Sequence, residues 1–113
     1  NRRYENAVKA FIAVSMRRED VIGAEAQYLL GTAYYEKGDY KDAITAFVRV
    51  ESVFGEFADW LAKSYLKLAD SYVKLKDNKK AISILEKLIE GHPDDDYGKE
   101  ASKKLKEIKK KKK

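Results

Sequence analysis

Apolar residues recur along this chain at intervals of three and four, the spacing that places them on one face of a helix. Charged or glycine-containing segments interrupt the pattern near Arg17, Gly38, Gly55, Asp77 and Gly91. The pattern therefore predicts an all-α chain of about six helices, near residues 4–16, 21–37, 39–55, 57–75, 77–90 and 94–108.

Residues suited to helix ends stand between these segments. Asp39 and Asp77 are predicted N-caps, because a carboxylate accepts hydrogen bonds from the free N–H groups of a first helical turn. Gly91 and Pro93 are predicted to end the fifth helix, since glycine tolerates left-handed geometry and proline cannot continue the hydrogen-bond ladder. The acidic run 94–96 is predicted to cap the last helix.

The apolar pattern repeats itself. Every landmark of one unit recurs 38 residues later, so that Leu30, Gly31, Tyr34, Ala43 and Phe47 correspond to Leu68, Ala69, Tyr72, Ala81 and Leu85. The small residues of each unit allow two helix axes to approach closely. A repeat of this kind predicts stacked helix pairs, each too small to bury its apolar face alone.

These landmarks resemble the tetratricopeptide repeat family. The resemblance implies a right-handed superhelix of antiparallel helix pairs that presents surfaces to protein partners. The chain departs from the family pattern at three points: Gln27 and Tyr65 stand where the family has tryptophan, Gly55 stands where it has proline, and the step of 38 residues exceeds the usual step of about 34.

The resemblance divides the single domain 1–113 into the second helix of an incomplete repeat at 1–17, repeats at 21–55 and 56–93, a terminal capping helix at 94–108 and a lysine tail at 109–113. The incomplete first unit suggests a fragment of a larger protein. The segment 24–31 and the sequence His92-Pro93-Asp94 at the end of the second repeat resemble bacterial cell-envelope members of the family. These are of the type of the Tol–Pal-associated periplasmic protein and the outer-membrane assembly lipoprotein. A periplasmic or cell-envelope location is therefore favoured over a cytoplasmic one.

The net charge of +5 is concentrated at the carboxyl end of the sequence. Lys109–Lys113 supply five positive charges, and the remaining chain is formally neutral. We therefore predict that basicity is a property of the tail. This leaves an alternative function, binding of nucleic acid or another anionic surface through the lysine tail.

Candidate chemistry is sparse. The chain has no cysteine, which excludes disulfides and thiol catalysis, and its single histidine, His92, lies between glycine and proline as a loop residue would. No glycine-rich phosphate loop or nucleophile motif occurs. The acidic run 94–96 lacks the ligand spacing of a calcium loop. We therefore expect neither an enzyme nor a metal or cofactor site.

The resemblance implies that the first helix of each pair lines a concave groove. Helical spacing and the shift of 38 residues place ten residues on that face: Glu25, Tyr28, Thr32, Tyr35, Glu36, Lys63, Leu66, Asp70, Val73 and Lys74. Family members that grip a terminal carboxylate carry lysine and asparagine in the groove. Here Tyr28, Thr32, Leu66 and Asp70 occupy those sites, so that clamp is not expected.

We therefore predict a protein-interaction scaffold that holds a peptide or helix of a partner protein in this groove. The apolar side of the first helix, formed by Val8, Phe11 and Ile12, has no predicted partner within the chain. This edge predicts self-association.

Overall fold

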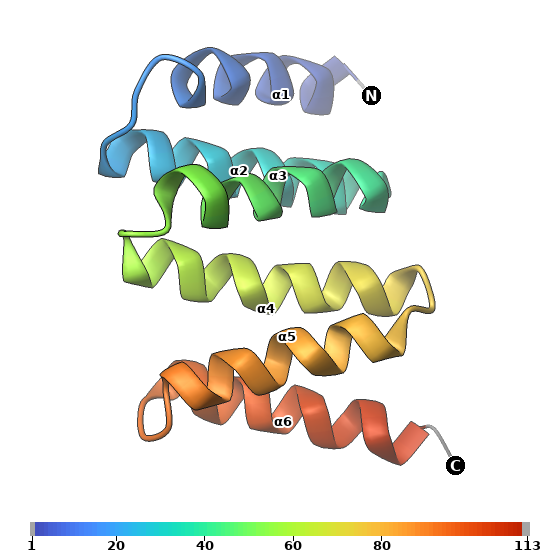
Figure 1. Ribbon diagram of the computed structural model, residues 1–113. Coiled ribbons are helices and arrows are strands. Elements are labelled where there is room, and N and C mark those ends of the chain that lie inside the picture. Colours follow the sequence, from blue (N-terminus) through green and yellow to red (C-terminus); the bar gives the residue numbers. More distant parts are fainter. Residues whose placement is uncertain (1, 112–113) are drawn as a thin grey trace.

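The computed structural model describes residues 2–111, which form six helices and no strand (Figure 1). The predicted all-α repeat fold is confirmed. In chain order the helices are α1 (Arg2–Ser15), α2 (Val21–Lys37), α3 (Tyr40–Phe54), α4 (Ala58–Lys74), α5 (Asn78–Gly91) and α6 (Asp96–Lys111). The first three lysines of the predicted tail continue α6, and Lys112 and Lys113 lie outside the described residues, as does Asn1.

The helices form two layers. Each helix packs antiparallel against the next one in sequence, and α4 also contacts both α2 and α6 (Figure 1). Within residues 2–111, the backbone of α3 packs closely against neither α1 nor α5. The helices α2, α4 and α6 therefore lie side by side in one layer, and α3 and α5 cover the junctions between them from the other side. The described chain measures 42 × 30 × 19 Å along its principal axes.

Close approach of α2 and α3 depends on Gly31. A Cβ atom at this position would lie 2.4 Å from a ring carbon of Phe47, whose side chain is fully buried. Ala69 and Ala81 are buried in the same way where α4 and α5 cross. The repeated small residues therefore serve the packing role that the sequence predicted for them.

The two departures at the family's tryptophan position are polar links between helices. Gln27 is 1% exposed, and its Nε2 donates a hydrogen bond of 2.9 Å to the backbone oxygen of Ala46 on α3. Tyr65 donates its hydroxyl to the Glu51 carboxylate of α3, and that carboxylate also lies 2.9 Å from Lys87 of α5. Burial of these polar groups is tolerated because each has a partner.

The predicted helix caps are realised unevenly. Asp77 accepts a hydrogen bond from the backbone N–H of Lys80 at 3.2 Å, as predicted. Asp39 occupies the N-cap position of α3, as predicted, but its side chain makes no capping hydrogen bond. The ammonium of Lys37, 3.4 Å away, holds its carboxylate instead. In the acidic run 94–96, Asp95 is the residue that caps α6, through the N–H of Gly98 at 3.1 Å.

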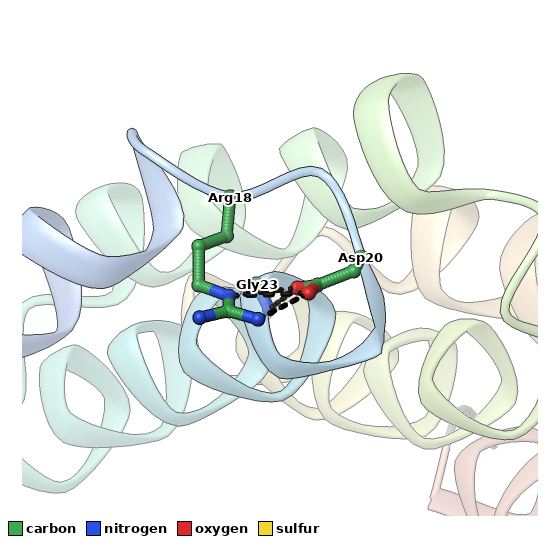
Figure 2. A network of polar contacts seen from close by, with 3 residues as sticks. All are labelled: Arg18, Asp20 and Gly23. Carbon is green, nitrogen blue, oxygen red and sulfur yellow. Dashed lines mark hydrogen bonds and ion pairs between the residues drawn. The ribbon is translucent and has the colours of Figure 1, made fainter.

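The turn between α1 and α2 contains a cap that the sequence pattern did not reveal. Asp20 accepts a hydrogen bond from the N–H of Gly23 at 3.2 Å, and the Nε of Arg18 lies 3.1 Å from both of its carboxylate oxygens (Figure 2). Gly23 leaves room for this turn, because a Cβ there would lie 2.2 Å from the backbone oxygen of Arg18. The hydrogen bond from Arg18, supported by that from Gly23, lowers the pKa of Asp20 to about 2.

This pKa predicts a specific loss of stability in acid. Because the folded pKa lies below the ordinary value of 3.8, the stabilisation is present above that value and is lost as the pH falls toward 2. Asp20→Asn retains an acceptor for Gly23 but carries no charge. The difference in thermal unfolding midpoint between wild type and this variant should therefore shrink between pH 5 and pH 2. A difference that stays constant over that range would contradict the assignment.

The first helix has an uncovered face. It packs against α2 alone. Val8 and Phe11 are half-buried, whereas Ile12 is 40% exposed. Val14 is also exposed, at 36%. Self-association through this edge stays a prediction.

No helix within residues 2–111 is both long enough and apolar enough to cross a membrane.

Candidate partner-binding groove

A groove of about 460 Å³ crosses the layer formed by α2, α4 and α6. We call it the inner groove. Its lining comes from all three helices and comprises Tyr28, Leu29, Trp60, Lys63, Leu66, Lys67, Asp70, Tyr97, Glu100 and Lys104. The central helix α4 supplies half of these residues. They are spaced three and four apart, which places them on one face of the helix.

The floor of the groove is aromatic and is anchored in the core. The ring of Tyr28 lies 5.5 Å from the ring of Trp60 across the α2–α4 junction, and 6.0 Å from the buried ring of Phe47. Leu66 is 7% exposed and lies beside them. Since Tyr28 and Trp60 are only half-buried, they offer apolar area to a bound molecule without having to move.

Two lysines of α4 are held over aromatic rings. The Nζ of Lys63 lies 4.6 Å from the centre of the Trp60 ring, and the Nζ of Lys67 lies 5.0 Å from the centre of the Tyr35 ring. Neither lysine forms an ion pair with a carboxylate of residues 2–111. The rings therefore position two ammonium groups whose charge is available to a partner.

A third lysine of the groove is neutralised within the protein. The Nζ of Lys104 on α6 lies 3.1 Å from both carboxylate oxygens of Asp70 on α4. The two side chains are 26% and 27% exposed. This ion pair spans the groove and fixes α6 against α4. Glu100 supplies a negative charge on the α6 side, opposite the two lysines of α4.

Two tyrosines at the groove have pKa values raised above the ordinary value of 10.0. Burial is the main cause for both. The negative charge of Asp70 adds to the effect on Tyr35, and that of Asp59 adds to the effect on Tyr97. Both hydroxyls therefore remain protonated at neutral pH and can donate hydrogen bonds.

The sequence profile of the tetratricopeptide repeat family matches residues 24–94, which is more than half of the chain. The chain belongs to the tetratricopeptide repeat family. This is a family of non-catalytic repeats that generally mediate interactions between proteins. Among curated proteins, none matches the sequence significantly.

In this tetratricopeptide repeat chain, the ten predicted groove residues separate into three groups. Four of them line the inner groove: Tyr28, Lys63, Leu66 and Asp70. Three others contact groove residues or line the adjoining smaller hollow: Thr32, Tyr35 and Val73. The remaining three are exposed and outside the hollows of this face: Glu25, Glu36 and Lys74.

Thr32, Tyr35 and Val73 have individual roles. The hydroxyl of Thr32 donates to the backbone oxygen of Tyr28 at 3.1 Å. Tyr35 carries the ammonium of Lys67 on its ring and meets Tyr40 edge to face, with ring centres 5.3 Å apart. Val73 lines a smaller hollow of about 140 Å³, which shares Asp70 and Lys104 with the inner groove.

Sequence reasoning missed the contribution of α6 and the residue Trp60. The signal for α6 was present, because a second shift of 38 residues leads from Tyr28 through Leu66 to Lys104. Because the last helix was assigned only a capping role, its contribution to the groove was not predicted. Trp60 lies one turn before Lys63 on the same helical face, so extending the predicted stripe by one turn would have included it.

His92 lies just after α5, in the loop that the sequence predicted for it. Its Nδ1 is 2.6 Å from a carboxylate oxygen of Asp95, and its ring meets Tyr97 edge to face at 5.4 Å. These contacts support the start of α6 next to the groove. Across residues 2–111, no cluster of three or more histidine, aspartate or glutamate side chains is arranged to hold a metal ion.

Proposed function

We propose that the chain is a protein-interaction scaffold that holds a short amphipathic helix or extended segment of a partner protein in the inner groove. The observation that supports this most directly is the pair of half-buried rings, Tyr28 and Trp60, which line a groove with a charged rim. Aromatic side chains of this kind carry much of the binding energy in protein interfaces. The groove volume of about 460 Å³ lies within the range of about 300–1,000 Å³ typical of ligand pockets.

The groove also favours a particular kind of segment. Apolar side chains of the partner would pack on Tyr28, Trp60 and Leu66. Acidic side chains would meet Lys63 and Lys67, the two ammonium groups that the protein leaves without a carboxylate. Because Asp70 is already held by Lys104, it has little capacity to bind a basic residue.

Selection from a displayed peptide library tests this function. We expect enrichment of peptides that combine apolar anchors with acidic residues. Their affinity should fall at least about tenfold in the Lys63→Glu/Lys67→Glu variant, since reversing two rim charges makes an attraction repulsive. The matched control is Lys9→Glu/Lys99→Glu, which changes the net charge equally at two exposed lysines outside the groove. Equal binding by both variants, or no groove-dependent peptide at all, would contradict the proposal.

Two narrower predictions from the sequence stay predictions. A location in the bacterial cell envelope rests on the resemblance of segment 24–31 and the loop at His92 to family members of that compartment. The alternative function, binding of nucleic acid or an anionic surface through Lys109–Lys113 alone, receives no support from the family match.

A further inference from the structure

Charge is sorted between the two ends of the helical array. At one end α1 begins, α2, α4 and α6 end, and α3 and α5 begin (right side of Figure 1). The segments there, 2–5, 36–42, 74–80 and 109–111, together carry eleven Lys and Arg residues against five Asp and Glu residues. We call this the basic end. At the opposite end, segments 16–20, 51–59 and 90–96 carry nine acidic against two basic residues.

The excess of positive charge lies in the lysine run, as the sequence predicted, but this does not describe how the other charges are arranged. The body of the chain is neutral in sum, but its acidic and basic residues lie at opposite ends of the molecule. The sequence could not reveal this, because residues of one end are separated by the length of a helix pair. Lys37, Lys41, Lys74, Lys76, Lys79 and Lys80 contribute to the basic end independently of the lysine run.

Helix stability explains only part of this distribution. Lysines in the last turns of α2, α4 and α6 complement the negative ends of the helix dipoles. Lys79 and Lys80, however, lie in the first turn of α5, which contains no acidic residue. Lys41 lies in the first turn of α3. Positive charge at a helix N-terminus is unfavourable. Lys80 pairs with the N-cap Asp77, whereas Lys41 and Lys79 form no ion pair with the described residues and need another explanation.

Lys76 is also costly to the fold. Its φ of 62° is left-handed, and it is the one non-glycine residue with positive φ within residues 2–111. Gly38, its counterpart 38 residues earlier, has φ 92°. The two turns are otherwise alike, because Asp77 N–H donates to Tyr72 and Asp39 N–H to Tyr34, both at 2.9 Å. Glycine would relieve the strain, and the presence of lysine suggests that its charge is needed.

Four of the six lysines in the turns 36–42 and 74–80 form no ion pair within residues 2–111. Lys37 pairs with Asp39 at 3.4 Å, and Lys80 pairs with Asp77 at 3.7 Å. The side chains of Lys41, Lys74, Lys76 and Lys79 are exposed and make no ion pair with the described part of the chain.

An apolar feature lies among these lysines. Leu75, in the α4–α5 turn, is 39% exposed, and its counterpart in the preceding repeat is Lys37. Together with Ile44 and Tyr72 it lines a hollow of about 460 Å³, whose charged lining residues are Lys41, Asp77 and Lys80. An exposed leucine with a lysine on each side of it in the chain suits the boundary between lipid headgroups and acyl chains.

We propose that the basic end docks on a bilayer containing anionic phospholipids. The lysines of the two turns contact the headgroups, and Leu75 enters the interface between them. The acidic end is repelled by the same surface and points away from it. This orientation sets the helix axes upright on the membrane and leaves the inner groove, which lies along the side of the array, accessible to a partner. The proposal does not depend on what the groove binds.

Co-sedimentation with phosphatidylcholine vesicles, with and without phosphatidylserine, tests the proposal. The full chain should bind only the phosphatidylserine vesicles, and binding should weaken as salt is added. Lys41→Gln/Lys74→Gln/Lys79→Gln should lower the affinity about a hundredfold, since each lysine near an anionic surface contributes about fivefold. The control Lys9→Gln/Lys99→Gln/Lys103→Gln changes the net charge equally away from the basic end and should bind almost as wild type does.

Lys76→Gly separates function from folding. It should raise the thermal unfolding midpoint, because glycine relieves the left-handed strain, and it should weaken vesicle binding. Three results would overturn the proposal: no dependence on phosphatidylserine, a loss caused only by substituting Lys109–Lys111, or tighter binding to duplex DNA that disappears in the triple variant. The last would make nucleic acid the partner of this end.

Discussion

Replacing Phe47 by alanine should lower the free energy of unfolding by about 3–5 kcal/mol. The side chain is fully buried and joins α3 to the helix on each side. Its ring lies against Gly31 and 6.0 Å from the ring of Tyr28. Truncation therefore removes contacts from both neighbouring helices and leaves a cavity that the backbone cannot fully close. The loss is a large fraction of the roughly 5–15 kcal/mol that stabilises a typical domain.

Urea unfolding of the variant and of Val48→Ala measures this effect. Val48 is the next residue on α3 but is 40% exposed, so its truncation should change stability by less than about 1 kcal/mol. Gly31→Ala provides a second arm, because its new methyl group would meet the ring of Phe47. It should destabilise wild type much more than it destabilises Phe47→Ala, which makes the two changes non-additive. Additive effects would mean that the ring and the glycine do not pack against each other.

The Gly31–Phe47 contact was predictable because it belongs to the repeat. Residues separated by a constant step occupy equivalent places in successive helix pairs, and the small residues mark where the axes cross. The helix boundaries followed from the apolar stripes for the same reason. The four predicted residues that line the groove, Tyr28, Lys63, Leu66 and Asp70, lie in the regular middle part of the stripes.

The features that sequence reasoning missed depend on contacts between distant segments. The carboxylate of Asp39 pairs with Lys37 and makes no capping hydrogen bond, whereas Asp77 at the equivalent position does cap its helix. The sorting of charge between the ends became visible only once the turns at Gly38 and Lys76 were placed side by side. Local pattern determined the helices, whereas surface properties required their arrangement.

Trp60→Ala should weaken the binding of a groove peptide by at least about 2 kcal/mol, which is roughly thirtyfold. Trp60 is the largest side chain of the groove, and its ring stacks beside Tyr28 at 5.5 Å and supports the ammonium of Lys63 at 4.6 Å. Truncation therefore removes the apolar contact and also frees a lysine that the ring holds in position. We expect the loss to appear mainly as faster dissociation, because most effects of interface substitutions lie in that rate.

Calorimetric titration of wild type, Trp60→Phe and Trp60→Ala with one selected peptide separates these contributions. Trp60→Phe keeps an aromatic face under Lys63 and should retain much of the affinity, whereas Val73→Ala, at the neighbouring smaller hollow, should change it little. Unfolding curves of the same variants are needed because Trp60 also packs against the buried side chains of Ala24, Val50 and Phe54. If Trp60→Ala binds as tightly as wild type while remaining folded, the aromatic floor is not the binding surface. An affinity loss accompanied by intact folding would instead locate the partner on the α4 face, since α4 supplies half of the groove's charged and aromatic groups.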